Sequence, residues 1–157
     1  MADFSIPRVA VPANLLLAGG GKREGEVYVM ERVPQHVGPE TPLDMLNRPE
    51  PFFPFRPKKG SDRILLVAKA RTVTLSVPRP QGEDSVRLSA AKKSTLEITL
   101  ADGSTLSGWA TLELPQHHSR VLDYLNAVAE PFFTIATSDG VLHLVNRAHV
   151  LYARPED

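Results

Sequence analysis

The five histidines are the residues best suited to chemistry, because histidine is the commonest acid–base catalyst and metal ligand near neutral pH. His36 and His117 stand at corresponding places in two similar segments, each just before a helical pattern, and His118 follows directly. A zinc site without cysteine needs three or four converging His, Asp or Glu ligands, and nothing in the sequence brings His143 or His149 to His117. We therefore expect no metal. We interpret His36 and His117 as polar residues near a helix N-terminus, and keep His117 and His118 as candidates for contacting a partner.

Neither the carboxylates nor the glycine run supplies an active site. Asp44 and Asp123 each stand alone in their segment, whereas general acid–base catalysis needs a positioned partner. The run from Gly19 to Lys22 lacks the spacing and the following helix of a phosphate-binding loop. The sequence contains no recognisable nucleophile–base pair, metal cluster or cofactor fingerprint. It therefore predicts a protein that is not an enzyme and binds no cofactor.

Two further features are candidates for binding a partner. The stretch 56–63 concentrates positive charge in Arg56, Lys58, Lys59 and Arg63. Such a run is usually a solvated loop, and the alternative is contact with phosphate or with an acidic partner surface. Trp109 falls opposite the apolar face of its predicted strand, and tryptophan is enriched in interfaces. The alternative is that a helix over residues 119–129 covers it.

Composition indicates a soluble globular protein. The 157 residues are 42% apolar and 23% charged, with no cysteine and a formal net charge of zero. The absence of cysteine favours a reducing compartment, and no apolar run approaches the roughly 18 residues that span a bilayer. We therefore expect a cytoplasmic location and no membrane contact. Residues 1–80 have 12 Lys and Arg against 8 Asp and Glu, a net charge of +4, and residues 81–157 have a net charge of −4.

The chain also reads as an internal duplication. Three short motifs recur in the same order about 80 residues apart: Pro34–His36 with Pro115–His117, Leu43–Asn47 with Leu122–Asn126, and Pro51–Phe53 with Pro131–Phe133. Single residues extend the match: Gly25 with Gly108, Val73 with Val150 and Pro78 with Pro155. Because a repeat of this kind indicates repeated structural units, we predict an extended arm over 1–11, a first copy over 12–78, a linker over 79–94 and a second copy over 95–155.

Each copy has the pattern of a small β-rich unit. In the second copy, Leu96 to Leu100 alternates as a strand, and Asp102-Gly103 is a hairpin turn. A return strand and a short helix follow, then strands over Phe132–Ala136 and from Val141 to Val145. The last of these is apolar on both faces, which predicts that it is buried or interfacial. In the first copy, Thr41-Pro42 predicts an N-cap followed by proline at the first helical position.

Two stretches resemble a known class of fold. Leu96 to Gly108 is similar to the opening hairpin of Sm-like proteins, and Leu144 to Val150 resembles their closing strand, tight turn and last strand. The resemblance to Sm-like and bacterial SH3-like small barrels, and to uncharacterised bacterial tandem small-barrel domains, implies a mainly β protein with short helices, of the α+β class. It implies two tandem SH3/Sm-like β-barrel modules, each with one helix inserted after the second strand. Sm-like proteins have their helix at the N-terminus, and no Sm-type nucleotide-binding loop is recognisable here, so RNA binding does not carry over.

These observations favour a non-catalytic protein that acts in protein–protein interaction or assembly, as a scaffold or adaptor. We expect it to form a homo-oligomer or to bind another protein. The oppositely charged halves favour head-to-tail contacts, which close into rings or continue as filaments. One alternative is an RNA- or nucleotide-binding regulator of Sm-like type, suggested by the hairpin and the basic first half. The last alternative is an enzyme that uses the His117-His118 region.

Overall fold

The fold is one open antiparallel sheet with short helices beside it. A computed structural model describes residues 8–31, 40–59, 63–79, 92–112, 121–127 and 129–156. These residues form ten strands in a single sheet, in the order β10-β6-β7-β8-β9-β5-β1-β2-β3-β4. The prediction of a mainly β chain with short helices is confirmed. The strand order is that of an open sheet with β10 and β4 at its edges, and the two closed barrels stay a prediction.

The first half of the described chain, residues 8–79, contains five strands and one helix. In chain order they are β1 (Arg8–Leu17), β2 (Lys22–Met30), α1 (Pro42–Asn47), β3 (Phe52–Pro57), β4 (Leu65–Ala68), the 3-10 turn η1 (Lys69–Arg71) and β5 (Thr72–Pro78). The predicted N-cap is confirmed: Thr41 and Asp44 form a capping box, in which each side chain accepts from the other's backbone N–H at 3.1 Å. Residues 8–11, expected in the arm, are the first residues of β1.

The second half, residues 92–156, follows the same plan. Its elements are β6 (Lys92–Leu100), β7 (Thr105–Leu112), α3 (Val121–Leu125), β8 (Phe132–Ala136), β9 (Val141–Asn146), the 3-10 turn η3 (Arg147–His149) and β10 (Val150–Pro155). Gly103 has φ +88° in the predicted Asp-Gly turn, a conformation that glycine adopts without steric cost. Of the helix predicted over 119–129, the described residues 121–125 are helical and residues 126 and 127 are not. Residues 92–94, expected in the linker, belong to β6.

The same backbone hydrogen bonds occur in both halves. The Ala18 and Ala101 N–H groups donate to Arg71 O and His149 O respectively, both at 2.8 Å. The first strand of each half pairs with the last, and each pairing has a register shift at the same place. Leu17 lies opposite Thr72 as Leu100 lies opposite Val150, so equivalent residues in the last strands are 78 apart. The sequence alignment of Val73 with Val150, at a spacing of 77, is therefore displaced by one residue. The equivalent of Val73 is Leu151.

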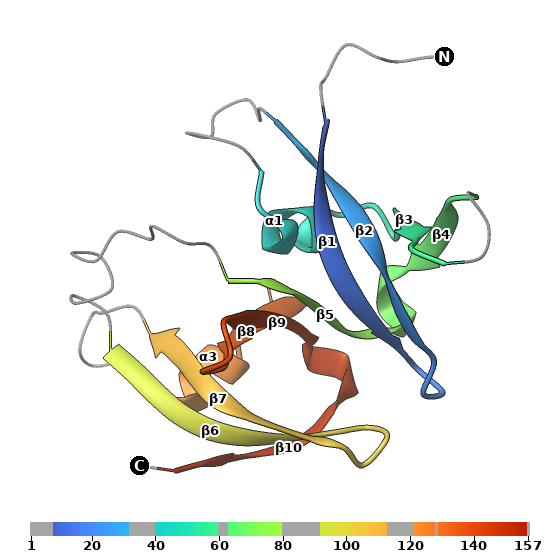
Figure 1. The fold of residues 1–157 in the computed structure, drawn as a ribbon. Coiled ribbons are helices and arrows are strands. Elements are labelled where there is room, and N and C mark those ends of the chain that lie inside the picture. Colours follow the sequence, from blue (N-terminus) through green and yellow to red (C-terminus); the bar gives the residue numbers. More distant parts are fainter. Residues whose placement is uncertain are drawn as a thin grey trace.

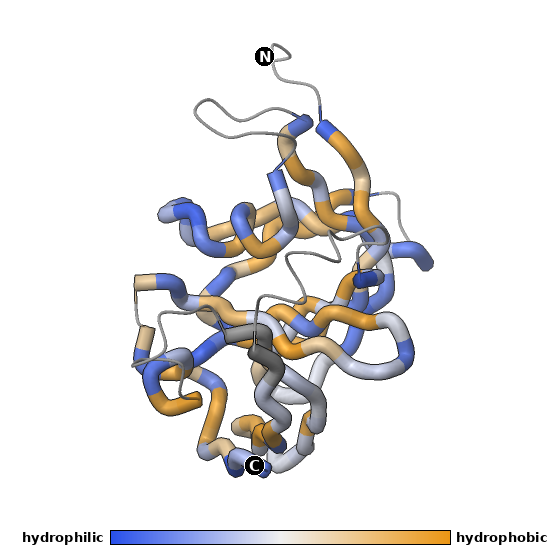
Figure 2. The backbone as a smooth tube through the Cα atoms, turned by 90° about the vertical axis from the view of Figure 1, so that its left-hand side faces the viewer, coloured by the Kyte–Doolittle hydropathy of each residue, from blue (hydrophilic) through white to orange (hydrophobic). Residues whose placement is uncertain are grey.

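The two halves meet where β5 pairs with β9, a contact we call the seam. Five residue pairs align there, from Thr74 opposite Val145 to Pro78 opposite Val141. Figure 1 places β1–β4 and α1 on one side of this seam and β6, β7 and β10 on the other, and Figure 2 shows apolar stretches in both parts. Each half has its own buried core, and both cores include residues from across the seam. Phe132 and Leu144 pack into the core of the first half, and Val73 packs into the core of the second.

Two matched glycines allow the strands to bend closely over one another. A Cβ on Gly108 would overlap Ala136 O and lie 2.7 Å from Ile135 Cγ2, and one on Gly25 would overlap Arg56 O and lie 2.8 Å from Phe55 Cζ. Both glycines therefore stand where the second strand of a half crosses the third, which gives the sequence match of Gly25 with Gly108 a steric explanation.

Replacing Gly108 by alanine should destabilise the fold. Forcing a methyl group against a neighbouring carbonyl costs about 1–3 kcal/mol in a packed interior, so Gly108→Ala should lower the free energy of unfolding by that amount in urea denaturation. Gly21→Ala is the matched control, because its Cβ would have only Leu17 Cβ nearby, at 3.9 Å. Equal stability of both variants would contradict the close strand crossing.

Candidate functional site

A serine and a histidine meet across the seam. Ser76 on β5 lies directly opposite His143 on β9, and Ser76 Oγ is 2.7 Å from His143 Nδ1. Thr137 Oγ1 lies 3.3 Å from Nε2 of the same ring and also donates to Asp139. Burial lowers the pKa of His143 below its ordinary 6.5, with Asp139 acting in the opposite direction. The ring is therefore neutral near pH 7, and both of its nitrogens have hydroxyl partners.

Ser76 and His143 are 67 residues apart, and the sequence predicted no nucleophile–base pair. The two line a groove of about 570 Å³, with residues from β1, β2, β5 and the β6–β7 turn. A serine next to a histidine is the starting point of nucleophilic catalysis, which also needs a third group that orients the base. In this position the second ring nitrogen meets the Thr137 hydroxyl instead of a carboxylate. We interpret the contact as a cross-strand hydrogen bond that joins the two halves.

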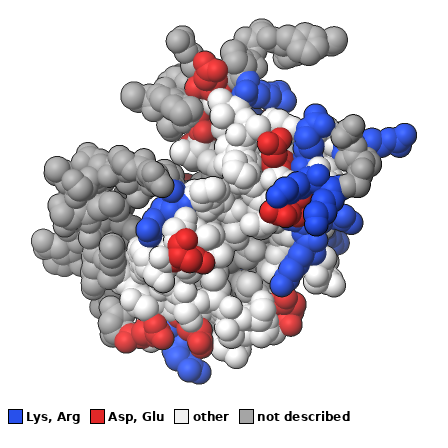
Figure 3. Space-filling model, viewed as in Figure 1, with Lys and Arg blue, Asp and Glu red and all other residues white. Residues whose placement is uncertain are grey.

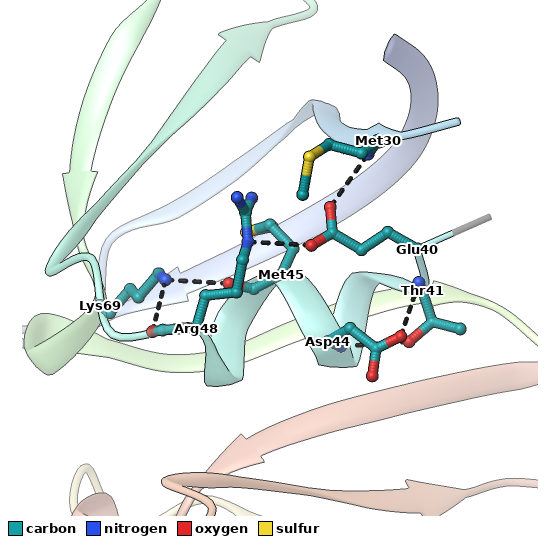
Figure 4. Close-up of polar contacts among 7 residues, drawn as sticks. All are labelled: Met30, Glu40, Thr41, Asp44, Met45, Arg48 and Lys69. Atoms are coloured by element: carbon teal, nitrogen blue, oxygen red, sulfur yellow. Dashed lines mark hydrogen bonds and ion pairs between the residues drawn. The ribbon is translucent and has the colours of Figure 1, made fainter. Parts of the chain in front are cut away.

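A second polar cluster surrounds the end of α1 (Figure 4). Lys69 is only 8% exposed, and its Nζ donates to Met45 O at 2.9 Å and to Arg48 O at 3.1 Å. Glu40 is 4% exposed, accepts a hydrogen bond from Met30 N and forms an ion pair with Arg48, with 2.9 Å between Nε and Oε2. Burial and the positive charge of Arg48 lower the pKa of Lys69. Buried charged groups of this kind are typical of active sites, and they also occur in structural networks.

The second half favours the structural interpretation of Lys69. Arg147 is the first residue of η3, as Lys69 is the first residue of η1. Its guanidinium donates to Leu125 O at 3.0 Å and to Glu130 O at 2.8 Å, and it lies over the rings of Tyr124 and Phe133. In both halves a cation therefore binds a carbonyl group in the last turn of a helix, Met45 O or Leu125 O, where positive charge is stabilising.

The candidate residues from the sequence lie in separate places. Trp109 is half-buried on β7, and the guanidinium of Arg79 lies 5.4 Å from its ring centroid. Arg56 Nε donates to Tyr28 Oη at 2.8 Å, and Lys58 Nζ lies 3.5 Å from a Glu24 carboxylate oxygen.

The remaining basic candidates, Lys59 and Arg63, are exposed on either side of residues 60–62. Lys and Arg gather on this side of the molecule in Figure 3. Five strands separate β7 from β3 in the sheet, so Trp109 and the basic group are not brought together. His36, His117 and His118 lie outside the described residues.

Exposed apolar side chains mark the two sheet edges. Among the described residues, eight large hydrophobic side chains are more than a third exposed: Val9, Phe52, Ile64, Leu65, Leu66, Leu122, Leu151 and Tyr152. Six of them lie in or beside an edge strand. Three belong to or precede β4, Phe52 lies on the neighbouring β3, and two belong to β10. The sequence did not indicate this, because alternation shows that a strand has an apolar face and not whether another strand covers it.

No family model, curated protein or solved structure matches this chain. Among the described residues, no helix combines the length and the apolar composition that crossing a membrane requires. Within the same residues, no three His, Asp or Glu side chains gather closely enough to hold a metal ion. We therefore infer the function of this chain from the arrangement of its described residues.

The buried state of His143 predicts a pH-dependent stability. Because its pKa is lowered in the folded chain, the unfolded chain binds the proton first as pH falls below 6.5. The stabilisation present above that pH is then lost in acid. The free energy of unfolding of His143→Gln should consequently fall less between about pH 7.5 and about pH 5 than that of the wild type, in urea denaturation at each pH.

His149→Gln is the matched control, since it replaces by the same amide a half-buried imidazole on η3, whose Nε2 lies 2.8 Å from Ala70 O. An unchanged pH dependence in His143→Gln would show that the seam histidine is not held in its neutral form.

Proposed function

We propose that this chain is a non-catalytic assembly protein, built from two tandem copies of one small-barrel module, which binds protein through the edge strands of its sheet. The observation that carries the proposal is the exposure of apolar side chains at both edges: Leu66 on β4 is 73% exposed, and Leu151 on β10 is 60% exposed. Sheet edges in soluble proteins are usually protected by charge, proline or a covering segment.

Backbone hydrogen bonding and the burial of apolar side chains both favour the addition of a strand at these edges. An edge strand has a row of backbone N–H and C=O groups on its outer side, which an added strand can pair with. Burying a leucine side chain contributes about 1.5–3 kcal/mol, so a contact that covers Leu66, Phe52 and Leu65 together gains several times the thermal energy. The repeated strand pairings and helix-end cations support the tandem architecture, because they recur at matched positions in the two halves.

Binding of RNA or nucleotide ranks behind assembly. The basic residues would have to exchange existing partners for phosphate, since Arg56 bonds Tyr28 and Lys58 pairs with Glu24. A histidine-dependent enzyme ranks last, because Ser76–His143 is accounted for as a contact within the sheet.

The proposal predicts self-association that depends on the apolar side chains of the edge strands, and not on exposed apolar side chains elsewhere on the molecule. Sedimentation velocity over the micromolar range should show the wild type larger than one chain. Leu66→Asp should shift it to the monomer, because a carboxylate on β4 cannot be buried without a partner. Val9→Asp is the matched control: Val9 is 42% exposed on β1, which has at least two strands between it and either edge strand, and its variant should assemble as the wild type does.

Circular dichroism should show the same fold in both variants, since both residues are exposed. A wild type that stays monomeric throughout the micromolar range would refute assembly through the edges.

A further inference from the structure

Three side chains hold the seam together by packing into the opposite half. Phe132 and Leu144, from β8 and β9, are 2% and 0% exposed in the core of the first half. Val73, from β5, is 2% exposed in the core of the second half. Asn47 at the end of α1 adds two hydrogen bonds: its side chain accepts from Phe132 N at 2.9 Å and donates to Phe132 O at 3.2 Å.

The two edge strands occupy the same places in their halves as the two seam strands. β4 pairs with β3 as β9 pairs with β8: Phe52 faces Ala68, and Phe132 faces Asn146. These alignments make Phe52 the equivalent of Phe132, and Leu66 the equivalent of Leu144. In the last strands, Val73 corresponds to Leu151, as the register shifts establish.

The equivalents of the three seam side chains are strongly exposed. Phe52 is 56%, Leu66 73% and Leu151 60% exposed, against 2% or less for their counterparts. Each exposed side chain has the position and apolar character of one that packs into the neighbouring half at the seam. The edges therefore repeat the two sides of an interface that the chain already forms once within itself.

Resting on the proposed function, we propose that the partner is a second copy of this chain, and that β4 of one copy pairs with β10 of the next in the register of the seam. Leu66 then lies opposite Ala153 of the next copy, as Leu144 lies opposite Leu75. Leu65 faces Arg154 in the same way, and Arg63 faces Glu156, which places opposite charges together. Basic residues gather around the β2–β4 side of the molecule (Figure 3).

The helix ends support the same docking. Asn126 follows α3 and matches Asn47 in the motif shared by the two halves. In the proposed contact, the Asn126 side chain bonds the backbone of the next copy's Phe52, as Asn47 bonds Phe132. Asn126 is exposed in the single chain. Replacing it with alanine should weaken association by about tenfold without lowering the stability of the monomer.

Because β4 and β10 are different surfaces, the contact is head-to-tail, and copies add in one direction into a ring or a filament. This gives a complementation test. Leu66→Asp blocks the β4 edge and leaves the β10 edge intact, and Leu151→Asp does the reverse. Each variant alone should be monomeric, and an equimolar mixture should form a 1:1 dimer in sedimentation velocity, with Val9→Asp assembling as the wild type.

The chain has no cysteine, so engineered disulfides report the register directly. Leu65→Cys is placed in the Leu151→Asp chain and Arg154→Cys in the Leu66→Asp chain, because these positions correspond to His143 and Ser76, which touch across the seam. Mild oxidation of the mixture should give the cross-linked pair. Ala153→Cys in place of Arg154→Cys points to the other sheet face and should not cross-link.

The outcomes separate the two proposals. A wild type that assembles while the mixed variants stay monomeric would overturn the head-to-tail contact and leave assembly standing. Equal cross-linking of both cysteine pairs would overturn the register. A wild type that remains monomeric would overturn both proposals.

Discussion

The pairing of β5 with β9 is the interaction on which the rest of the structure depends. It joins two five-strand groups into one sheet, and it is the place where side chains of each half enter the core of the other. Buried polar contacts reinforce it: Asn146, 5% exposed, donates to Lys69 O and Thr72 O from across the seam. Because each half gives one edge to this pairing, each retains one uncovered edge, and those two edges are β4 and β10.

Local features could be predicted from the sequence, and long-range pairing could not. The Thr41 cap and the Asp-Gly turn at Gly103 depend on neighbouring residues and are found as predicted. The strand from Val141, apolar on both faces, does lie between two strands, β8 and β5. Its partner in the first half was not predictable, because alternation indicates which residues share a face and not which distant strand lies beside them. The Ser76–His143 contact and the exposed edges follow from that pairing, and were missed for the same reason.

Comparing the halves also separates structural chemistry from functional chemistry. The buried cation at the end of α1 would suggest an active site if it occurred once. Arg147 donates to a carbonyl group at the end of α3 as Lys69 does in α1, so stabilisation of the helix end explains both cations. The difference between the halves lies elsewhere: the side chains that are buried at the seam are exposed at the edges. That contrast, and not a cluster of reactive groups, leads to the proposal of assembly.

Hydrogen exchange followed by mass spectrometry tests the central claim most directly. The outward-facing backbone amides of β4 and β10 should exchange quickly in dilute protein and become protected together as concentration rises, whereas β9 and β5 should be protected throughout. Protection of both edges over the same concentration range is the result that head-to-tail strand pairing predicts. Edges that exchange at the same rate in the assembled and the dilute protein would contradict it.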